Sequence, residues 1–153
     1  GKGVFDLGCN SGGMLIELAD KITHGVGVDF NPRLINVANL IRSAYHHDNI
    51  SFYNFDLRHE PTSLLNDLAT EKIDVCLMLS IAAYLPNWKE LVKWCSDTAP
   101  TLVFEAHGTV EFIDEQIKCI KSIYSDVQTL TKIGNYDDNT DGEKSRQLFL
   151  CNK

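Results

Sequence analysis

The sequence is short of positive charge. Its 153 residues carry 14 Lys and Arg against 21 Asp and Glu, which gives a formal net charge of -7. A protein of that sign does not attract the phosphate backbone of a nucleic acid over its whole surface, although a local basic patch stays possible. The composition therefore disfavours nucleic acid as a partner and mildly favours a small molecule.

Paired cysteines and long apolar runs are also missing. The chain has five cysteines, an odd number, and no two of them have CxxC spacing, so neither a zinc site nor a disulfide framework is indicated. Most of them lie among apolar residues, which predicts buried, reduced thiols in a cytoplasmic protein. No run is long enough to span a bilayer and no signal peptide is visible. We expect no metal and no membrane partner.

What the sequence does have is an alternation of short apolar runs with longer amphipathic runs. This order is typical of a parallel sheet with helices on both faces. The predicted strands are residues 3–8, 25–30, 50–55, 73–79, 101–106, 127–133 and 147–151. The predicted helices are residues 12–22, one that starts at Asn31-Pro32, 61–68, one that starts at Pro86, and 109–124. In the second of these, Asn31 should be the N-cap and Pro32 the first helical residue. The last two strands are joined by a polar loop with the acidic run 137–143 and no helix, so they should pair antiparallel.

The predicted fold is therefore α/β, a Rossmann-like seven-stranded and mostly parallel sheet whose last strand is antiparallel. No internal repeat or linker divides the chain, and 153 residues fit one domain, so we expect residues 1–153 to form a single core domain. The sequence enters its first strand at Gly3, almost at once. We expect such a core to lack its N-terminal segment.

Glycines mark the turn after the first predicted strand. Ligands of open parallel sheets bind beyond the carboxyl ends of the strands. Gly8 and Gly12 follow the first strand and allow a sharp bend and a close approach of a ligand to the backbone. The next helix points its N-terminal N–H groups toward the same place. This turn is the first part of a predicted ligand site.

Two carboxylates close the second and third predicted strands. Asp29 can accept hydrogen bonds from both hydroxyls of a ribose, and Phe30 beside it offers an apolar face for a purine. Asp56 can accept from an exocyclic amine, while the N–H of Leu57 can meet a ring nitrogen. Together these residue types indicate a pocket for a cofactor that contains adenosine.

At this point the sequence resembles the class I S-adenosylmethionine-dependent methyltransferases. The motifs that carry the resemblance are DLGCNSG (6–12), GVGVDFNP (25–32), FDL (55–57) and IDVCLMLS (73–80), in that order. The terminal antiparallel pair at 127–151 is similar to the last two strands of the family. The resemblance covers nearly the whole chain and implies S-adenosylmethionine as cofactor.

The resemblance also implies a role for each matching residue. Asp6 and the loop from Gly8 to Gly12 would hold the methionine moiety, and Ser80 would contact the cofactor near the transferred methyl. The implied cofactor-binding residues are Asp6, Gly8, Cys9, Asn10, Gly12, Asp29, Phe30, Asp56, Leu57 and Ser80. Asn10 departs from the family, which often has glycine there, but asparagine tolerates left-handed backbone angles better than most residues.

Candidate bases follow the fourth and fifth predicted strands. They are Tyr84, Glu105 and His107. Methyl transfer needs a nucleophile in line with the methyl group and, for some acceptors, removal of a proton. The Asn-Pro-Pro-aromatic tetrad of many amino-methylating nucleic-acid enzymes is absent, since Ser80 to Tyr84 reads SIAAY. Methylation of a nucleic-acid base is therefore disfavoured.

Two other functions remain open from the sequence. A dinucleotide-binding oxidoreductase domain would also use Asp29, but Gly8, Asn10 and Gly13 match only two of its three glycines. A relative that binds the cofactor without catalysis would keep the fold. The sequence does not choose the acceptor, the O, N or C atom methylated, or the oligomeric state, although a small-molecule acceptor is favoured.

Overall fold

The computed structural model describes residues 1–131 and 146–153. Within these residues seven strands form a sheet in the order β3-β2-β1-β4-β5-β7-β6. The predicted fold class, a mostly parallel sheet with an antiparallel pair at its end, is confirmed. The chain divides into two compact units, residues 1–77 and 78–153, and β4 (Val75–Leu79) contains the division.

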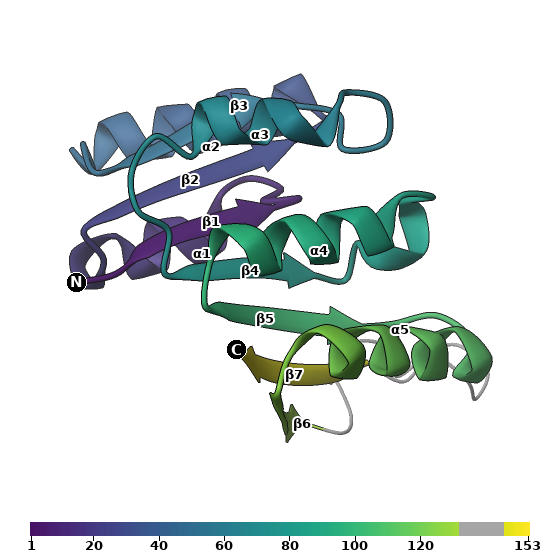
Figure 1. Ribbon diagram of the computed structural model, residues 1–153. Coiled ribbons are helices and arrows are strands. Elements are labelled where there is room, and N and C mark those ends of the chain that lie inside the picture. The colour runs from purple at the N-terminus through teal and green to yellow at the C-terminus, as the bar shows by residue number, and fades with distance from the viewer. Residues whose placement is uncertain (132–145) are drawn as a thin grey trace. The chain divides into compact units, whose positions relative to one another are not determined.

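Three parallel strands form the centre of the first unit (Figure 1): β1 (Gly3–Leu7), β2 (His24–Asp29) and β3 (Ile50–Asn54). All of β1 and all but the first residue of β2 are buried. Their sequences are therefore nearly continuous apolar runs rather than alternating ones, as expected for strands covered on both faces. The strands are in parallel register, so their carboxyl ends meet at one edge of this unit.

The helices of the first unit begin and end at recognisable local signals. The longest is α2 (Pro32–Ala44), where the side-chain oxygen of Asn31 accepts a hydrogen bond of 3.0 Å from the N–H of Arg33. This confirms the predicted cap and the place of Pro32 at the first helical position. Helix α1 (Gly13–Leu18) is shorter than predicted, because the chain tightens into a 3₁₀ turn, η1 (Ala19–Lys21).

The segment after β3 is mostly short turns. It contains η2 (Thr62–Leu64) and α3 (Leu65–Leu68), which together match the short helix predicted after Pro61. Leu65 is fully buried and anchors this segment to the unit.

The second unit is built around antiparallel pairs. Strand β7 (Gln147–Asn152) lies between β5 (Thr101–Ala106) and β6 (Asp126–Thr131) and is antiparallel to both. Two helices, α4 (Trp88–Thr98) and α5 (Val110–Ile123), and the 3₁₀ turn η3 (Ala82–Tyr84) complete it. The polar loop predicted between the last strands, with its acidic run 137–143, falls outside the described residues.

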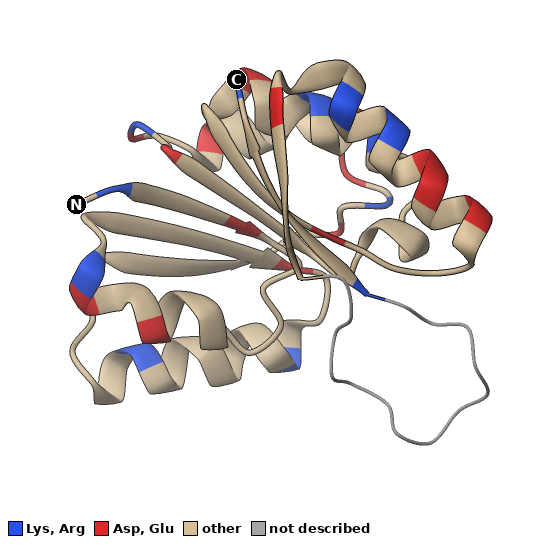
Figure 2. Cartoon of the chain, turned by 90° about the horizontal axis from the view of Figure 1, so that it is seen from below, with Lys and Arg blue, Asp and Glu red and all other residues tan. Residues whose placement is uncertain are grey.

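Helix α5 has a charge arrangement that suits its backbone dipole. Glu111 lies in its first turn and Lys121 in its last turn, and Figure 2 shows acidic segments at one end of the helix and basic segments at the other. Negative charge at the N-terminus and positive charge at the C-terminus both stabilise a helix.

Among the described residues no helix is both long enough and apolar enough to cross a membrane.

Candidate functional site

The loop between β1 and α1 bends through three left-handed residues. Gly8, Asn10 and Gly12 have φ angles of 76°, 52° and 80°, so the structure bears out the prediction that Asn10 tolerates such an angle. The N–H groups of Gly8 and Cys9 both donate to the carbonyl of Val28 at 2.9 Å. These bonds hold the loop against the end of β2.

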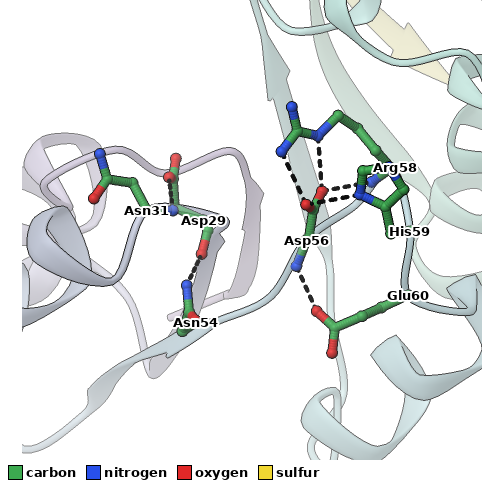
Figure 3. Close-up of polar contacts among 7 residues, drawn as sticks. All are labelled: Asp29, Asn31, Asn54, Asp56, Arg58, His59 and Glu60. Carbon is green, nitrogen blue, oxygen red and sulfur yellow. Dashed lines mark hydrogen bonds and ion pairs between the residues drawn. The ribbon is translucent and has the colours of Figure 1, made fainter.

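Asp29 is the centre of this part of the structure (Figure 3). It ends β2 and is only 6% exposed. Its Oδ2 accepts a hydrogen bond of 3.0 Å from the N–H of Asn10, and its Oδ1 accepts one of 2.9 Å from the N–H of Asn31. The side chain of Asn54 donates to the Asp29 carbonyl at 3.0 Å. One carboxylate thus ties the glycine loop to the start of α2.

The two oxygens of Asp29 keep capacity for a ligand. Each accepts one hydrogen bond from the described residues, and each carboxylate oxygen has room for about two. One acceptor position on each oxygen is what two neighbouring hydroxyls of a ribose require. The residues present therefore fit a ribose-containing cofactor at this point.

Asp6 lies beside Asp29 and is buried, with 3% of its surface exposed. Burial, and then the nearby negative charge of Asp29, raises the pKa of the Asp6 carboxyl to about 7. Burial also raises the pKa of the Cys9 thiol well above its usual range. Cys9 is therefore a neutral thiol that packs in the loop rather than a nucleophile.

Asp56 has a different environment from Asp29 (Figure 3). Arg58 donates to it from Nε and Nη2, both at 2.9 Å, and His59 Nδ1 lies 3.0 Å from Oδ2. The hydrogen bond from Arg58 is the main cause that holds the pKa of the Asp56 carboxyl well below its usual range. The backbone N–H of Asp56 donates to Glu60.

Phe30 and Leu57, the other predicted adenine contacts, differ in exposure. Phe30 is 56% exposed, while Leu57 is 6% exposed. The guanidinium carbon of Arg58 lies 4.6 Å from the centroid of the Phe30 ring. Sequence analysis did not select Arg58, because a lone arginine in a loop carries no periodic signal that shows which groups it contacts.

The second unit brings the remaining candidates together in pairs. Ser80 has a left-handed φ of 56°, and its hydroxyl donates a hydrogen bond to Glu105 Oε2. The ring of Tyr84, which is 71% exposed, lies 5.3 Å from the ring of the buried His107. These four residues all lie at or just beyond the carboxyl ends of β4 and β5.

Gln116 is a buried polar residue of this unit that sequence analysis missed. Its side chain is fully buried, and Nε2 donates to the carbonyls of His107 at 2.9 Å and Phe112 at 3.2 Å. It therefore fixes the turn that follows β5, where Gly108 has a φ of 123°. Its position three residues after the buried Ile113 and four before the buried Ile120 was the available signal.

A cavity opens beside η3 in the second unit. Its volume is about 420 Å³, which lies in the range of small-molecule sites. The lining residues are Ala82, Ala83, Tyr84, Leu85, Pro86, Trp88 and Phe112. None of them is charged.

In the described part of the chain no cluster of three or more His, Cys, Asp or Glu side chains could hold a metal ion.

Several solved structures share this fold. The N-terminal domain of EvdMO1, a crystal structure with SAH bound, has a TM-score of 0.79 and 10% identity over 99% of this chain and 74% of its own. The bifunctional kinase-methyltransferase WbdD has a TM-score of 0.71 and 21% identity, over 99% of this chain but 34% of its own. Precorrin 8W decarboxylase of Methanobacterium thermoautotrophicum has a TM-score of 0.71 and 18% identity, over 99% and 81%.

The sequence comparisons give a family but no individual relative. A search of curated protein sequences finds no match. The profile of the family described as "Methyltransferase domain" matches residues 5–99, a range that runs from β1 to the end of α4. Since this range is more than half of the chain, and the fold is that of the structures named above, the protein belongs to the methyltransferase domain family and is an S-adenosylmethionine-dependent methyltransferase.

Proposed function

We propose that the chain transfers the methyl group of S-adenosylmethionine to a small-molecule acceptor, and that the residues at the carboxyl ends of β1, β2 and β3 bind the cofactor. The observation that carries the binding proposal is Asp29. Its carboxylate is buried and held in place by two backbone N–H groups, yet each of its oxygens keeps one acceptor position.

The other binding roles follow from the same edge of the first unit. Asp29 accepts from the ribose hydroxyls, and the exposed ring of Phe30 packs on the adenine. Asp56 and the N–H of Leu57 bind the adenine edge. Asp6 and the loop from Gly8 to Gly12, with Cys9 and Asn10, hold the methionine moiety, whose ammonium group matches the buried carboxyl of Asp6.

The cofactor supplies a methyl group on a sulfonium that is already activated. The protein has to position the acceptor and, where the acceptor carries a proton, remove it. The hydrogen bond from Ser80 orients the carboxylate of Glu105, so Glu105 is the candidate proton acceptor. The rings of Tyr84 and His107 contact one another, and these two residues are the further candidates for positioning the acceptor.

Two features support a small-molecule acceptor. The cavity beside η3 is lined by uncharged residues and has the volume of a small-molecule site. The chain has a formal net charge of -7, which opposes the long-range attraction of a nucleic acid. The chain spans 34% of the WbdD chain and 36% of the EvdMO1 chain, and the proposal concerns methyl transfer alone.

The test is a calorimetric titration of the purified chain with S-adenosylmethionine, S-adenosylhomocysteine and NAD in parallel. We expect the two adenosyl compounds to bind at micromolar concentration and NAD not to bind. Binding of NAD alone would contradict the cofactor site and favour an oxidoreductase domain. Binding of S-adenosylmethionine with no release of S-adenosylhomocysteine over a panel of phenols, amines and carboxylates would indicate a module that binds without catalysis.

A further inference from the structure

Arg58 makes a fork-shaped contact with Asp56 that fills the acceptor positions of this carboxylate. Oδ1 accepts from the backbone N–H of Arg58 at 3.0 Å and from its Nε at 2.9 Å. Oδ2 accepts from Nη2 at 2.9 Å and faces His59 Nδ1 at 3.0 Å. A carboxylate has about four acceptor positions, so all four are engaged by these two neighbours.

The same guanidinium also covers the ring of Phe30. Its carbon lies 4.6 Å from the ring centroid, which is within the range of a cation–π contact. A guanidinium is planar and stacks on aromatic faces, as the adenine ring does. Arg58 therefore contacts both of the side chains that the proposed cofactor site assigns to adenine.

The carboxylate of Asp29, in contrast to that of Asp56, keeps acceptor positions for a ligand. Each of its oxygens accepts one backbone hydrogen bond and keeps a second position. At Asp29 a ligand hydroxyl can be added, whereas at Asp56 a ligand amine has to replace a donor that is already bound. The carboxylate proposed to bind ribose thus keeps acceptor positions, whereas the acceptor positions of the carboxylate proposed to bind adenine are filled.

We propose that Arg58 is a competitive arm, which occupies the adenine position between Phe30 and Asp56 and has to leave it when the cofactor binds. The proposal rests on the adenine site of the proposed function. Release of the arm is feasible because the ion pair is exposed, with 38% of the Arg58 side chain and 27% of the Asp56 side chain accessible. Exposed ion pairs contribute little free energy, so a bound adenine can displace the guanidinium. The arm lowers cofactor affinity without abolishing it.

The decisive experiment measures the dissociation constant of S-adenosylhomocysteine for the whole chain and for Arg58→Ala. We expect the variant to bind about two- to five-fold more tightly, the range that corresponds to loss of one exposed ion pair. Arg33→Ala is the matched control, because it removes the same charge from the first turn of α2 and leaves the pair of Arg58 with Asp56 in place. It should leave the dissociation constant unchanged.

A second ligand tests whether the gain comes through Asp56. S-inosylhomocysteine has a carbonyl oxygen in place of the exocyclic amine, and a carboxylate cannot accept from an oxygen that has no hydrogen. Arg58→Ala should therefore tighten S-adenosylhomocysteine more than S-inosylhomocysteine. Equal gains for the two ligands would overturn the competition at Asp56.

A spectroscopic measurement follows the arm directly in the unmutated chain. In an NMR titration with S-adenosylhomocysteine, the Nε–H resonance of Arg58, assigned from its loss in Arg58→Ala, should move as the bond to Asp56 breaks. Unchanged or weaker binding by Arg58→Ala, or an Nε–H resonance that stays in place at saturation, would overturn the proposal while leaving the cofactor site intact. Absence of binding by the chain and all its variants would refute the adenine site, and the arm with it.

Discussion

Ser80 donates its hydroxyl hydrogen bond to the carboxylate of Glu105, and it does so from a backbone conformation that residues other than glycine rarely adopt. Ser80 directly follows β4 and has a left-handed φ of 56°. Such conformations persist only where the surrounding structure holds them, and they cluster at functional sites. This relationship makes Glu105 the best-positioned of the candidate bases.

Replacing Glu105 with glutamine separates its charge from its position. The Glu105→Gln side chain still accepts the hydrogen bond from Ser80, but it no longer takes a proton. We expect the turnover number to fall by about 10²- to 10⁴-fold, the usual contribution of a general base, with an unchanged dissociation constant for S-adenosylhomocysteine. Turnover is measured with the acceptor that reacts fastest in the panel.

Glu115→Gln is the control for this experiment. Glu115 is a half-exposed carboxylate on α5 that pairs with Lys89, so its loss should leave turnover unchanged. A normal turnover number for Glu105→Gln would exclude Glu105 as the base and leave His107 and Tyr84 as candidates.

Asp29→Asn tests the ribose contact. The amide oxygen still accepts from one of the two backbone N–H groups, but the amide nitrogen accepts neither the other N–H nor a ribose hydroxyl. The control variant measures the effect of losing a backbone hydrogen bond alone. We expect the affinity for S-adenosylhomocysteine to fall by about 1–3 kcal/mol, or roughly 5- to 150-fold, measured by calorimetry. Asp74→Asn is the control, because Asp74 also accepts a backbone N–H, that of Gly3 at 2.9 Å, but at the start of β1. Equal affinities for the Asp29 variant and the unmutated chain would remove Asp29 from the site.

The pKa of Asp6 makes stability depend on pH in a defined direction. Burial raises the pKa of the folded carboxyl from its ordinary value of 3.8 to about 7, so the native state binds more protons than the unfolded state between these values. The free energy of unfolding should therefore decrease as pH rises from about 4 to 7 and then level off with respect to this group.

Asp6→Asn removes this dependence because the amide is neutral at every pH. We expect the variant to melt at least about 5 °C higher than the unmutated chain at pH 8, with a smaller difference near pH 4. Calorimetric melting curves from pH 4 to 8 measure both effects. The exposed Asp20 is the control site, and Asp20→Asn should shift the melting temperature little. A lower melting temperature for Asp6→Asn at pH 8 would show that the buried charge is compensated.

Two adjacent glycines give a matched pair of substitutions. Gly12 has a φ of 80°, and an added Cβ would lie 2.5 Å from Cζ of Phe52. Gly13 is helical and has nothing within 4 Å of an added Cβ. Gly12→Ala should lower the free energy of unfolding by about 2–4 kcal/mol through backbone strain and overpacking, whereas Gly13→Ala should raise it by up to about 1 kcal/mol. Urea denaturation measures both, and equal effects would contradict the structure of the loop.

Much of the fold was predictable because its signals are local. The strands of the first unit are short and largely apolar runs, of which β2 and β3 end in the polar residues Asp29 and Asn54. The Asn31-Pro32 cap of α2 is a short-range motif that folds as expected. The early end of α1 was not predictable, since the apolar spacing continues through Ala19 to Ile22 while the backbone tightens into a 3₁₀ turn. Tertiary contacts set that boundary, because local spacing fits either form.

The site divides in the same way. Asp29 could be selected from its place at the end of a strand, and the structure shows it buried beside the glycine loop. Nothing in the sequence indicated that Arg58 reaches back to Asp56 and over Phe30, because a long side chain in a loop has many possible partners. Gln116 could have been selected, since a lone amide in an apolar helical stripe needs a hydrogen-bond partner inside the protein.

The two hydrogen bonds that Asp29 accepts from the backbone N–H groups of Asn10 and Asn31 have a consequence for engineering this protein. Removing the side chain as Asp29→Ala would leave two backbone donors without an acceptor, so a loss of binding could not be told apart from a collapse of the loop. A folded variant that does not bind the cofactor therefore needs a substitution at a residue that contacts the ligand but does not hold the fold together. The exposed Phe30 is such a place, because Phe30→Ala removes a side chain that the proposed site assigns to adenine and that the core does not use.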